Sequence, residues 1–492
     1  MLVPRVVAAD DAESLEYIFD GMDIKFLERL MRTGLKQTDQ STIMLDIAVP
    51  VISSFASHAQ IAAKPRMLER IPTLLNVIGR QLPQVSNEAT QAVCRIMSTD
   101  DGAESVLESP EGLIKAIDSL GSADPADGDL VSFVDFALNR LSTFANSGRG
   151  HGLLSQWVEL VMTAAALFDD NQQMLKFELI GVLASALEPI DQETAADADT
   201  QRPCGQLTSH TISGCVSVLR QKSETTQYAD QALVLASHLV RLWPDCVFTD
   251  KRRRGKEPDD QRKQSDLILR LACIEGQSSI DSMMISPPPA KGKPDQPRLK
   301  RGWKLPFCAE IAAGWLEWVA RWLDEQEPES DDIDEEGIYS AMGSVQKLAA
   351  AAIGFLVDWR DRVERDQEVL EASPTVCLST VRLLTQWLAT DPKLHSDALP
   401  LLTMFTRWIK ERPEHSTTLQ GYLRPCITFA LDTCGIDEGK FVKDLQAREL
   451  THTRGEGMEF ASPWVGSIEF DDLAYAVYNI PSDEEILAKR QG

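Results

Sequence analysis

The sequence lacks the short motifs on which most catalytic and metal sites are built. It contains no CxxC pair, no HExxH, no GxSxG and no glycine loop that ends in Lys-Ser or Lys-Thr. These absences argue against the common zinc, nucleophile and nucleotide-phosphate chemistries. Histidines are also scarce and dispersed, at His58, His151, His210, His238, His395, His415 and His452. No catalytic residue, cofactor-binding residue or metal ligand is therefore predicted, and His238 is interpreted as a histidine of the helical core or surface.

Positive charge is in short supply. The chain has 49 Lys and Arg against 75 Asp and Glu, a formal net charge of −26. Such a balance opposes binding of nucleic acid, or of an anionic membrane, through the surface as a whole. Protein or peptide partners that carry basic patches fit this charge better.

Long apolar runs and paired cysteines are absent as well. Uncharged apolar stretches such as 179–187 are too short to span a bilayer, and the first residues lack the apolar core of a signal peptide. Nine cysteines are scattered through apolar helical patterns, as expected of reduced thiols. We therefore expect a cytoplasmic protein, with the nucleus as the other reducing compartment.

The sequence is rich in helical periodicity. Apolar residues recur at i, i+3, i+4 and i+7, and the alternation of a half-buried strand is almost never seen. Two stripes show the pattern, with Pro50 expected to kink the second helix or to begin a second piece of it. Their predicted inward residues are Phe26, Leu27, Leu30 and Met31, and then Met44, Ile47, Ala48, Val51, Ile52 and Phe55. The chain is predicted to be all-α.

The predicted helices succeed one another at the scale of an armadillo or HEAT repeat, about 40–47 residues for two or three helices. An α-solenoid is therefore predicted over 20–459, after an N-terminal segment (1–19) and before a C-terminal cap and tail (460–492). Inserted loops are expected at about 187–205, 250–264, 286–304 and 324–336, where the sequence is polar, basic and Pro-rich, or acidic. A large irregular helical domain is the alternative, because no strict residue pattern recurs.

Two motifs have both a structural and a functional interpretation. The segment 146–152, NSGRGHG, superficially resembles a phosphate loop, but it joins two predicted helices and is interpreted as a helix C-terminal turn using Gly148 and Gly150. Trp315, Trp318 and Trp322 fall on one face of a predicted helix. This stripe is interpreted first as core packing and second as an exposed aromatic ridge for peptide binding.

A basic run stands out against the acidic background. It comprises Lys251, Arg252, Arg253, Arg254, Lys256, Arg262 and Lys263. Three interpretations stay open: a solvated loop, a nuclear-import signal, or a contact for anionic lipid or an acidic protein. Membrane binding is expected only through this loop.

The segments 21–35 and 45–78 resemble the N-terminal helical region of the neurochondrin family, and the similarity is specific over about residues 20–145. Matching residues include Phe26, Leu27, Leu30 and Met31; Val51, Ile52, Ser54 and Phe55; and Ile61, Ala62, Ala63, Met67, Ile71, Pro72 and Leu74. The resemblance implies a cytoplasmic, armadillo-like helical scaffold without enzymatic activity.

Three functional hypotheses follow. The first is a non-catalytic scaffold or adaptor that binds protein partners along an acidic superhelical surface, without a cofactor. The second is a regulator that binds anionic membrane or enters the nucleus through the basic run. The third is an enzyme on an irregular helical scaffold, which would need a pocket that gathers distant carboxylates and histidines.

Overall fold

The computed structural model describes most of the first 399 residues and a few beyond them. The described residues are 12–36, 41–80, 83–121, 128–171, 174–196, 201–220, 226–248, 260–285, 303–325, 335–365, 374–399, 401, 431 and 433–435. All their regular elements are helices, so the predicted all-α class is confirmed. The predicted cap and tail, 460–492, lies outside the described residues.

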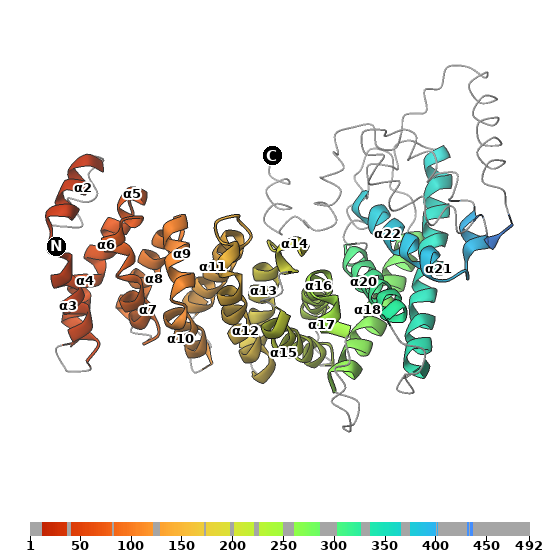
Figure 1. Cartoon of the computed structure of the whole chain (residues 1–492), viewed down its shortest axis with the longest axis horizontal. Helices are drawn as coiled ribbons and strands as arrows, with labels where there is room; N and C mark the ends of the chain where they lie inside the picture. Colours follow the sequence, from red (N-terminus) through yellow and green to blue (C-terminus); the bar gives the residue numbers. More distant parts are fainter. Residues whose placement is uncertain are drawn as a thin grey trace, which may run out of the picture. The chain divides into compact units, whose positions relative to one another are not determined.

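The chain forms two compact units, Met1–Thr249 and Asp250–Gly492 (Figure 1). The boundary falls at the start of the predicted basic loop. Unit 1 comprises α2 (Ala12–Gly21), α3 (Ile24–Gly34), α4 (Ser41–Ala56), α5 (Ala59–Ala62), α6 (Pro65–Leu68), α7 (Ile71–Ile78), α8 (Pro83–Met97), α9 (Asp100–Glu108), α10 (Glu111–Leu120), α11 (Gly128–Ala145), η1 (His151–Leu153), α12 (Leu154–Asp170), α13 (Leu175–Leu187), α14 (Gln192–Ala195), α15 (Gln201–Arg220), α16 (Thr226–Leu242) and α17 (Pro244–Phe248).

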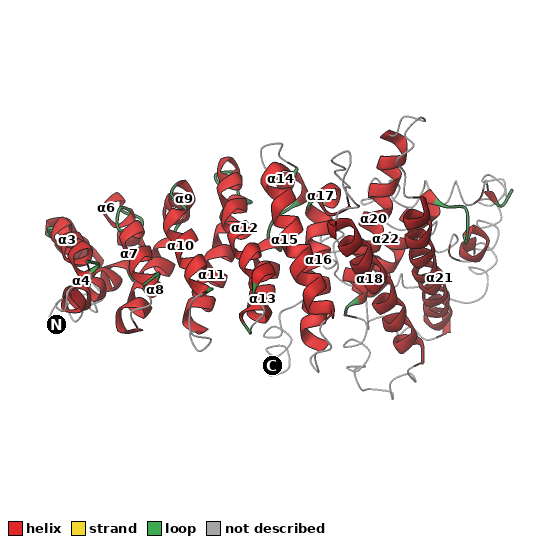
Figure 2. Ribbon diagram, turned by 90° about the horizontal axis from the view of Figure 1, so that it is seen from below, coloured by secondary structure: helices red, strands yellow, loops and turns green. Residues whose placement is uncertain are grey.

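Unit 1 is a solenoid of three-helix repeats, in which a short helix is followed by two longer ones. The second helices α3, α7, α10, α12 and α15 pack on one another in chain order, and so do the third helices α4, α8, α11, α13 and α16 (Figure 2). Third helices begin at 41, 83, 128, 175 and 226, close to the predicted repeat length. Residues buried between the two rows, such as Leu74, Ile96 and Trp157, form the core.

Two turns between repeats share one local structure. The hydroxyl of Thr99 donates to the Ile96 carbonyl and accepts from the Gly102 amide at 3.0 Å. Ser147 makes the same pair of bonds, to the Phe144 carbonyl and from the Gly150 amide at 3.2 Å. Segment 146–152 is thus part of an inter-repeat turn.

The two turn glycines are needed because of close backbone contact. A Cβ on Gly102 would lie 1.9 Å from the Ile96 carbonyl oxygen, and one on Gly150 would lie 2.0 Å from that of Phe144. Gly148 has open space around it, so Gly150 is the glycine of 146–152 that the turn requires.

Unit 2 is built from longer helices: α18 (Asp260–Ile285), α20 (Leu305–Glu325), α21 (Glu335–Arg365) and α22 (Pro374–Thr390). They pack pairwise, α18 on α20 and α21, and α22 on α20 and α21. Within α21, Gly337–Asp358 is long and apolar enough to cross a bilayer by length and composition. Its residues Val345, Leu348 and Leu356 are fully buried, as in the core helix of a packed domain.

Several details differ from the sequence-based expectations. Phe26 and Ile47 face solvent, with 53% and 54% of their surface exposed, because α3 and α4 bury a narrower stripe than the apolar pattern indicates. α4 runs through Pro50 as one helix. The predicted loops at 187–205 and 250–264 are shorter than expected, since α14 lies inside the first, α15 begins at Gln201 and α18 begins at Asp260.

Candidate protein-binding surface

The predicted tryptophan stripe on α20 is divided between core and surface. Trp315 is buried, with 2% of its surface exposed. Trp318 and Trp322 are half-buried and stack on one another, with ring centroids 6.2 Å apart and an interplanar angle of 23°. The stacked pair therefore lies at the edge of the unit 2 core, and the three rings do not form one exposed ridge.

The predicted basic run falls mostly outside the described residues, which include neither Lys251, Arg252, Arg253 and Arg254 nor Lys256. Arg262 and Lys263 lie in the first turn of α18, and the Lys263 side chain is exposed. The structure therefore leaves the three interpretations of this run as predictions.

A different surface emerges in unit 1, on the solvent-facing sides of the third helices α4, α8, α11 and α13. We call it the third-helix face. Side chains link neighbouring helices across it: Arg95 Nη1 donates to the Ser53 carbonyl at 3.0 Å, and Asn139 Nδ2 donates to the Ser185 carbonyl at 3.1 Å. At the next step, from α13 to α16, the rings of Phe177 and Tyr228 contact one another with centroids 4.4 Å apart and an interplanar angle of 33°. The face is therefore continuous from α4 to α16.

Large apolar side chains project from this face in, or just before, the N-terminal halves of three of its helices. Ile43 and Ile47 of α4 are 58% and 54% exposed, Phe136 of α11 is 36% exposed, and Met174, just before α13, is 58% exposed. Isolated exposed apolar residues are common on protein surfaces, but these lie on one face in three of its four repeats. A recurring apolar row of this kind is typical of an interaction surface.

Carboxylates accompany these apolar residues. Asp46 lies on α4, Glu88 on α8, Asp129 and Asp135 on α11, and Glu178 on α13. Together with Ile43, Ile47, Phe136 and Met174 they form what we call the acidic-apolar lane. Asp129 and Glu178 lie in the first turns of their helices, where the helix dipole stabilises a negative charge. Asp46 and Glu88 lie further along their helices. The dipole therefore does not account for this second pair.

Glu88 occupies an unfavourable environment for a carboxylate. Its Oε2 is buried and has no hydrogen-bond partner among the described residues. Burial, and secondly the nearby negative charge of Asp46, raise the pKa of Glu88 above its ordinary value. The negative charges of these two carboxylates, on neighbouring third helices, therefore repel one another, and a positively charged group from outside would relieve that repulsion.

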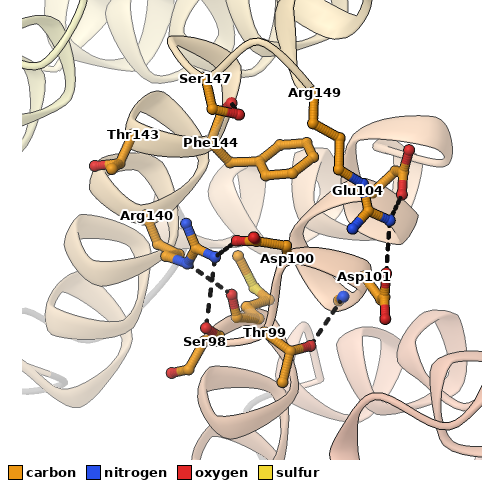
Figure 3. A network of polar contacts seen from close by, with 12 residues as sticks. Ser98, Thr99, Asp100, Asp101, Glu104, Arg140, Thr143, Phe144, Ser147 and Arg149 are labelled. Atoms are coloured by element: carbon orange, nitrogen blue, oxygen red, sulfur yellow. Dashed lines mark hydrogen bonds and ion pairs between the residues drawn. The ribbon is translucent and has the colours of Figure 1, made fainter.

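The cations of the third helices are used elsewhere. Arg140 Nε donates to the Met97 carbonyl at 3.0 Å, and its guanidinium also pairs with Asp100 (Figure 3). Arg95 similarly reaches the last turn of α4, and Arg241 donates to the Leu187 carbonyl at 3.2 Å. These arginines stabilise the C-terminal ends of the preceding helices, where carbonyls lack intrahelical partners.

In the N-terminal halves of the described third helices there is one basic residue, Lys176, and its side chain is buried. Lys176 is fully buried, with its ammonium 5.5 Å from the Phe168 ring centroid and 3.4 Å from the Asp169 carbonyl. Burial lowers the pKa of this lysine. The acidic-apolar lane is therefore negative in sign along the helices that carry it.

The C-terminal halves of the same helices have a contrasting character. Ser54, Ser98, Thr143 and Ser185 occur at intervals of 44, 45 and 42 residues, and each hydroxyl donates to a carbonyl three or four residues earlier in its helix. We call these four residues the hydroxyl row. Because these side chains are short, they project less from the face than the larger side chains of the acidic-apolar lane.

Two titratable side chains of unit 1, His238 and Cys94, have pKa values shifted by burial toward the uncharged form. Burial, with a smaller contribution from Arg241, lowers the pKa of His238 to about 3, so this histidine is neutral at physiological pH. Burial raises the pKa of the Cys94 thiol to about 11. In the described part of the chain, no group of three or more His, Cys, Asp or Glu could hold a metal ion.

Sequence reasoning missed the third-helix face because periodicity assigns apolar residues to the core by default. Ile47 was predicted to point inward, and Phe136, beside Asp135, gave no separate signal. The sequence did hold one signal: the pair Asp46-Ile47 on one helix is matched by Asp135-Phe136 two repeats later. Irregular spacing hides that repeat, as the four residues of the hydroxyl row show.

Stacked three-helix repeats with an outward-facing third-helix row define the class of this protein as an α-solenoid. The chain belongs to the Neurochondrin family, because the family model of that description matches residues 1–430. The predicted resemblance is thereby confirmed, and it extends well beyond 20–145. Family and fold together suggest a scaffold-like protein without catalytic activity.

Solved structures and curated proteins add little to this assignment. Two crystal structures of engineered proteins are similar to the chain, at 13% and 14% sequence identity with TM-scores of 0.40 and 0.33. The alignments cover 88% of this chain and 93% of the first protein, and 58% of this chain and 97% of the second. None of the curated proteins matches the chain.

Proposed function

We propose that the protein is a non-catalytic scaffold in the cytoplasm that binds protein partners through the third-helix face of unit 1. One observation carries the proposal: exposed apolar side chains lie on or beside three of the four third helices of this face, α4, α11 and α13, and carboxylates lie on all four. Apolar contact area supplies affinity, and complementary charge supplies specificity and association rate. Partners are therefore expected to present apolar residues together with basic ones.

Repeat architecture suits this role. Each repeat contacts its neighbours and adds one helix to a surface that extends with the number of repeats. Rigid helices hold the apolar and acidic side chains before a partner arrives, which lowers the entropic cost of binding. Free thiols at Cys94, Cys215, Cys273 and Cys434 are consistent with a reducing compartment.

The test is affinity purification of the tagged full-length protein from its native cells, with cross-linking mass spectrometry. The variant Ile47→Ser/Phe136→Ser removes two apolar side chains of the lane. Tyr339→Ser is the matched control, because Tyr339 is 73% exposed on α21 of unit 2. We expect one or more proteins to cross-link to α4–α13, to be lost from the lane variant and to be retained by the control.

Unchanged recovery from the lane variant, or cross-links confined to unit 2, would refute a role for the third-helix face. Substitutions of exposed residues leave the core intact, so circular dichroism of both variants should match that of the wild type. A variant with reduced helix content would be replaced by Ile47→Ser alone, because Ile47 is 54% exposed and Phe136 only 36%.

A further inference from the structure

The acidic-apolar lane has an order along the solenoid that specifies the chemistry of its partner. Aligning the third helices on their buried residues places Ile47, Gln91, Phe136 and Glu178 at equivalent outward positions. Glu88 lies on α8, which packs between α4 and α11, and Asp46 directly precedes Ile47 on α4. A partner crossing the helices therefore meets an apolar, an acidic and again an apolar site.

We infer that the lane binds an extended protein segment in which one basic residue is flanked on both sides by apolar residues. Lysine or arginine would be seated between Asp46 and Glu88, and the flanking side chains would pack on Ile47 and on Phe136. This inference rests on the proposed function and narrows it to a class of ligand.

Charge complementarity supports a basic occupant. Glu88 carries a buried oxygen without a described hydrogen-bond partner, and Asp46 lies close enough to raise its pKa further. A buried or half-buried carboxylate is stabilised when a cation donates hydrogen bonds to it. The nearest arginine on α8, Arg95, is directed instead to the Ser53 carbonyl, so it does not supply that cation.

Geometry gives the spacing of the segment. Packed helices lie about 10 Å apart, so Ile47 and Phe136, two helices from one another, are separated by about 20 Å. An extended chain advances about 3.3–3.6 Å per residue, and six residues therefore cover this distance. Each apolar residue should lie about three positions from the basic residue.

The low hydroxyl row favours an extended segment beside the lane. Ser54, Ser98 and Thr143 present small side chains whose hydroxyls are already bonded within their own helices. A peptide backbone can approach such a surface closely while its side chains reach the neighbouring lane. Recognition would then depend on side-chain spacing, as in other complexes of extended peptides.

The experiment is selection of random twelve-residue peptides, displayed on phage, on the immobilised full-length protein. Selected peptides are then measured by fluorescence anisotropy against the wild type, Glu88→Lys and Asp118→Lys. Asp118 is exposed in the last turn of α10, a second helix, so its substitution gives the same charge change away from the lane. Lysine is also favourable at a helix C-terminus.

We expect enriched peptides to contain Lys or Arg with apolar residues about three positions to each side. Glu88→Lys should weaken their binding about tenfold, because a favourable charge pair becomes a repulsive one, and Asp118→Lys should leave it unchanged. Exchanging the peptide's basic residue for Glu should restore binding to Glu88→Lys.

Three outcomes would overturn the inference: no enrichment, enriched peptides without a basic residue, or equal affinity for Glu88→Lys and the wild type. The proposed function is tested separately by cross-linking. If cellular partners depend on Ile47 and Phe136 while their bound segments lack a basic residue, the scaffold proposal stands and the ligand class is wrong.

Discussion

The two units pack their helices in different ways. Unit 1 uses short repeats joined by tight turns, in which glycine backbone touches backbone at Gly102 and Gly150. Unit 2 uses long helices, up to the 31 residues of α21, and ties them with polar contacts between residues far apart in sequence. Arg382 on α22, for example, donates to Glu310 on α20 at 2.6 Å.

This difference decides where a binding surface can arise. In unit 1 the third helix of each repeat keeps one side exposed to solvent. Equivalent positions therefore recur along the repeats, and side chains at these positions can form a lane. Pairwise packing of long helices in unit 2 exposes apolar residues at unrelated positions, such as Ile274, Leu323 and Tyr339. Unit 1 is therefore the better candidate for recognition of an extended partner, and the predictions below test the contrast between the units.

The largest effect is expected from Gly102→Ala in unit 1. A methyl group would overlap the Ile96 carbonyl, 1.9 Å from its oxygen, so the turn must move. We expect a loss of about 3 kcal/mol in the free energy of unfolding, the upper range for overpacking. Hydrogen exchange with mass spectrometry should show reduced protection in unit 1 while α18–α22 keep theirs.

Gly148→Ala is the matched control, because its Cβ has no neighbour within 4 Å. Equal loss of protection from both variants would mean that the turn tolerates a side chain at Gly102. Loss of protection throughout the chain would contradict an effect confined to unit 1.

A smaller effect is expected in unit 2 from Glu310→Ala. The Glu310 side chain is 7% exposed, and its loss leaves Arg382 without its closest carboxylate. Removing one partner of a buried ion pair costs about 3 kcal/mol or more, and since Arg382 is 22% exposed we expect about 2 kcal/mol. Glu317→Ala should cost less, because Glu317 is 35% exposed and lies 3.7 Å from the same guanidinium.

Chemical denaturation with hydrogen exchange distinguishes these outcomes by unit. Glu310→Ala should reduce protection in α20 and α22 and spare α4–α16. An equal effect of Glu310→Ala and Glu317→Ala would show that burial of the carboxylate does not set the strength of this contact.

Sequence patterns predicted the helices well because burial imposes a 3.6-residue period on each of them. They also predicted the scale of the repeat, and the buried Trp315 agrees with the packing interpretation of its stripe. They could not predict which apolar residues face outward, since Ile47 belongs to the same apolar pattern as the buried Ile52. The pairing of Asp46 with Glu88 was equally hidden, because it joins different repeats.

The smallest effect on stability is expected from Glu88→Gln. Because the pKa of Glu88 is raised in the folded state, the charged carboxylate destabilises the fold above that pKa. Below the ordinary value of 4.5 the carboxyl is protonated in both the folded and the unfolded chain, and the penalty disappears. Glu88→Gln should therefore be more stable than the wild type at pH 7, by about 0.5 kcal/mol for this half-exposed group, and equal to it near pH 4.

The same substitution should act in the opposite direction on binding. If Glu88 is held beside Asp46 to receive a basic residue, Glu88→Gln gains stability and loses affinity for the selected basic peptides. Substitution of a residue with only a structural role would not raise the free energy of unfolding while lowering peptide affinity. Natural proteins keep a locally destabilising residue mainly where it serves function. Denaturation and anisotropy of this one variant therefore test whether the acidic-apolar lane is a binding site: a gain in both quantities, or a loss in both, would contradict that role.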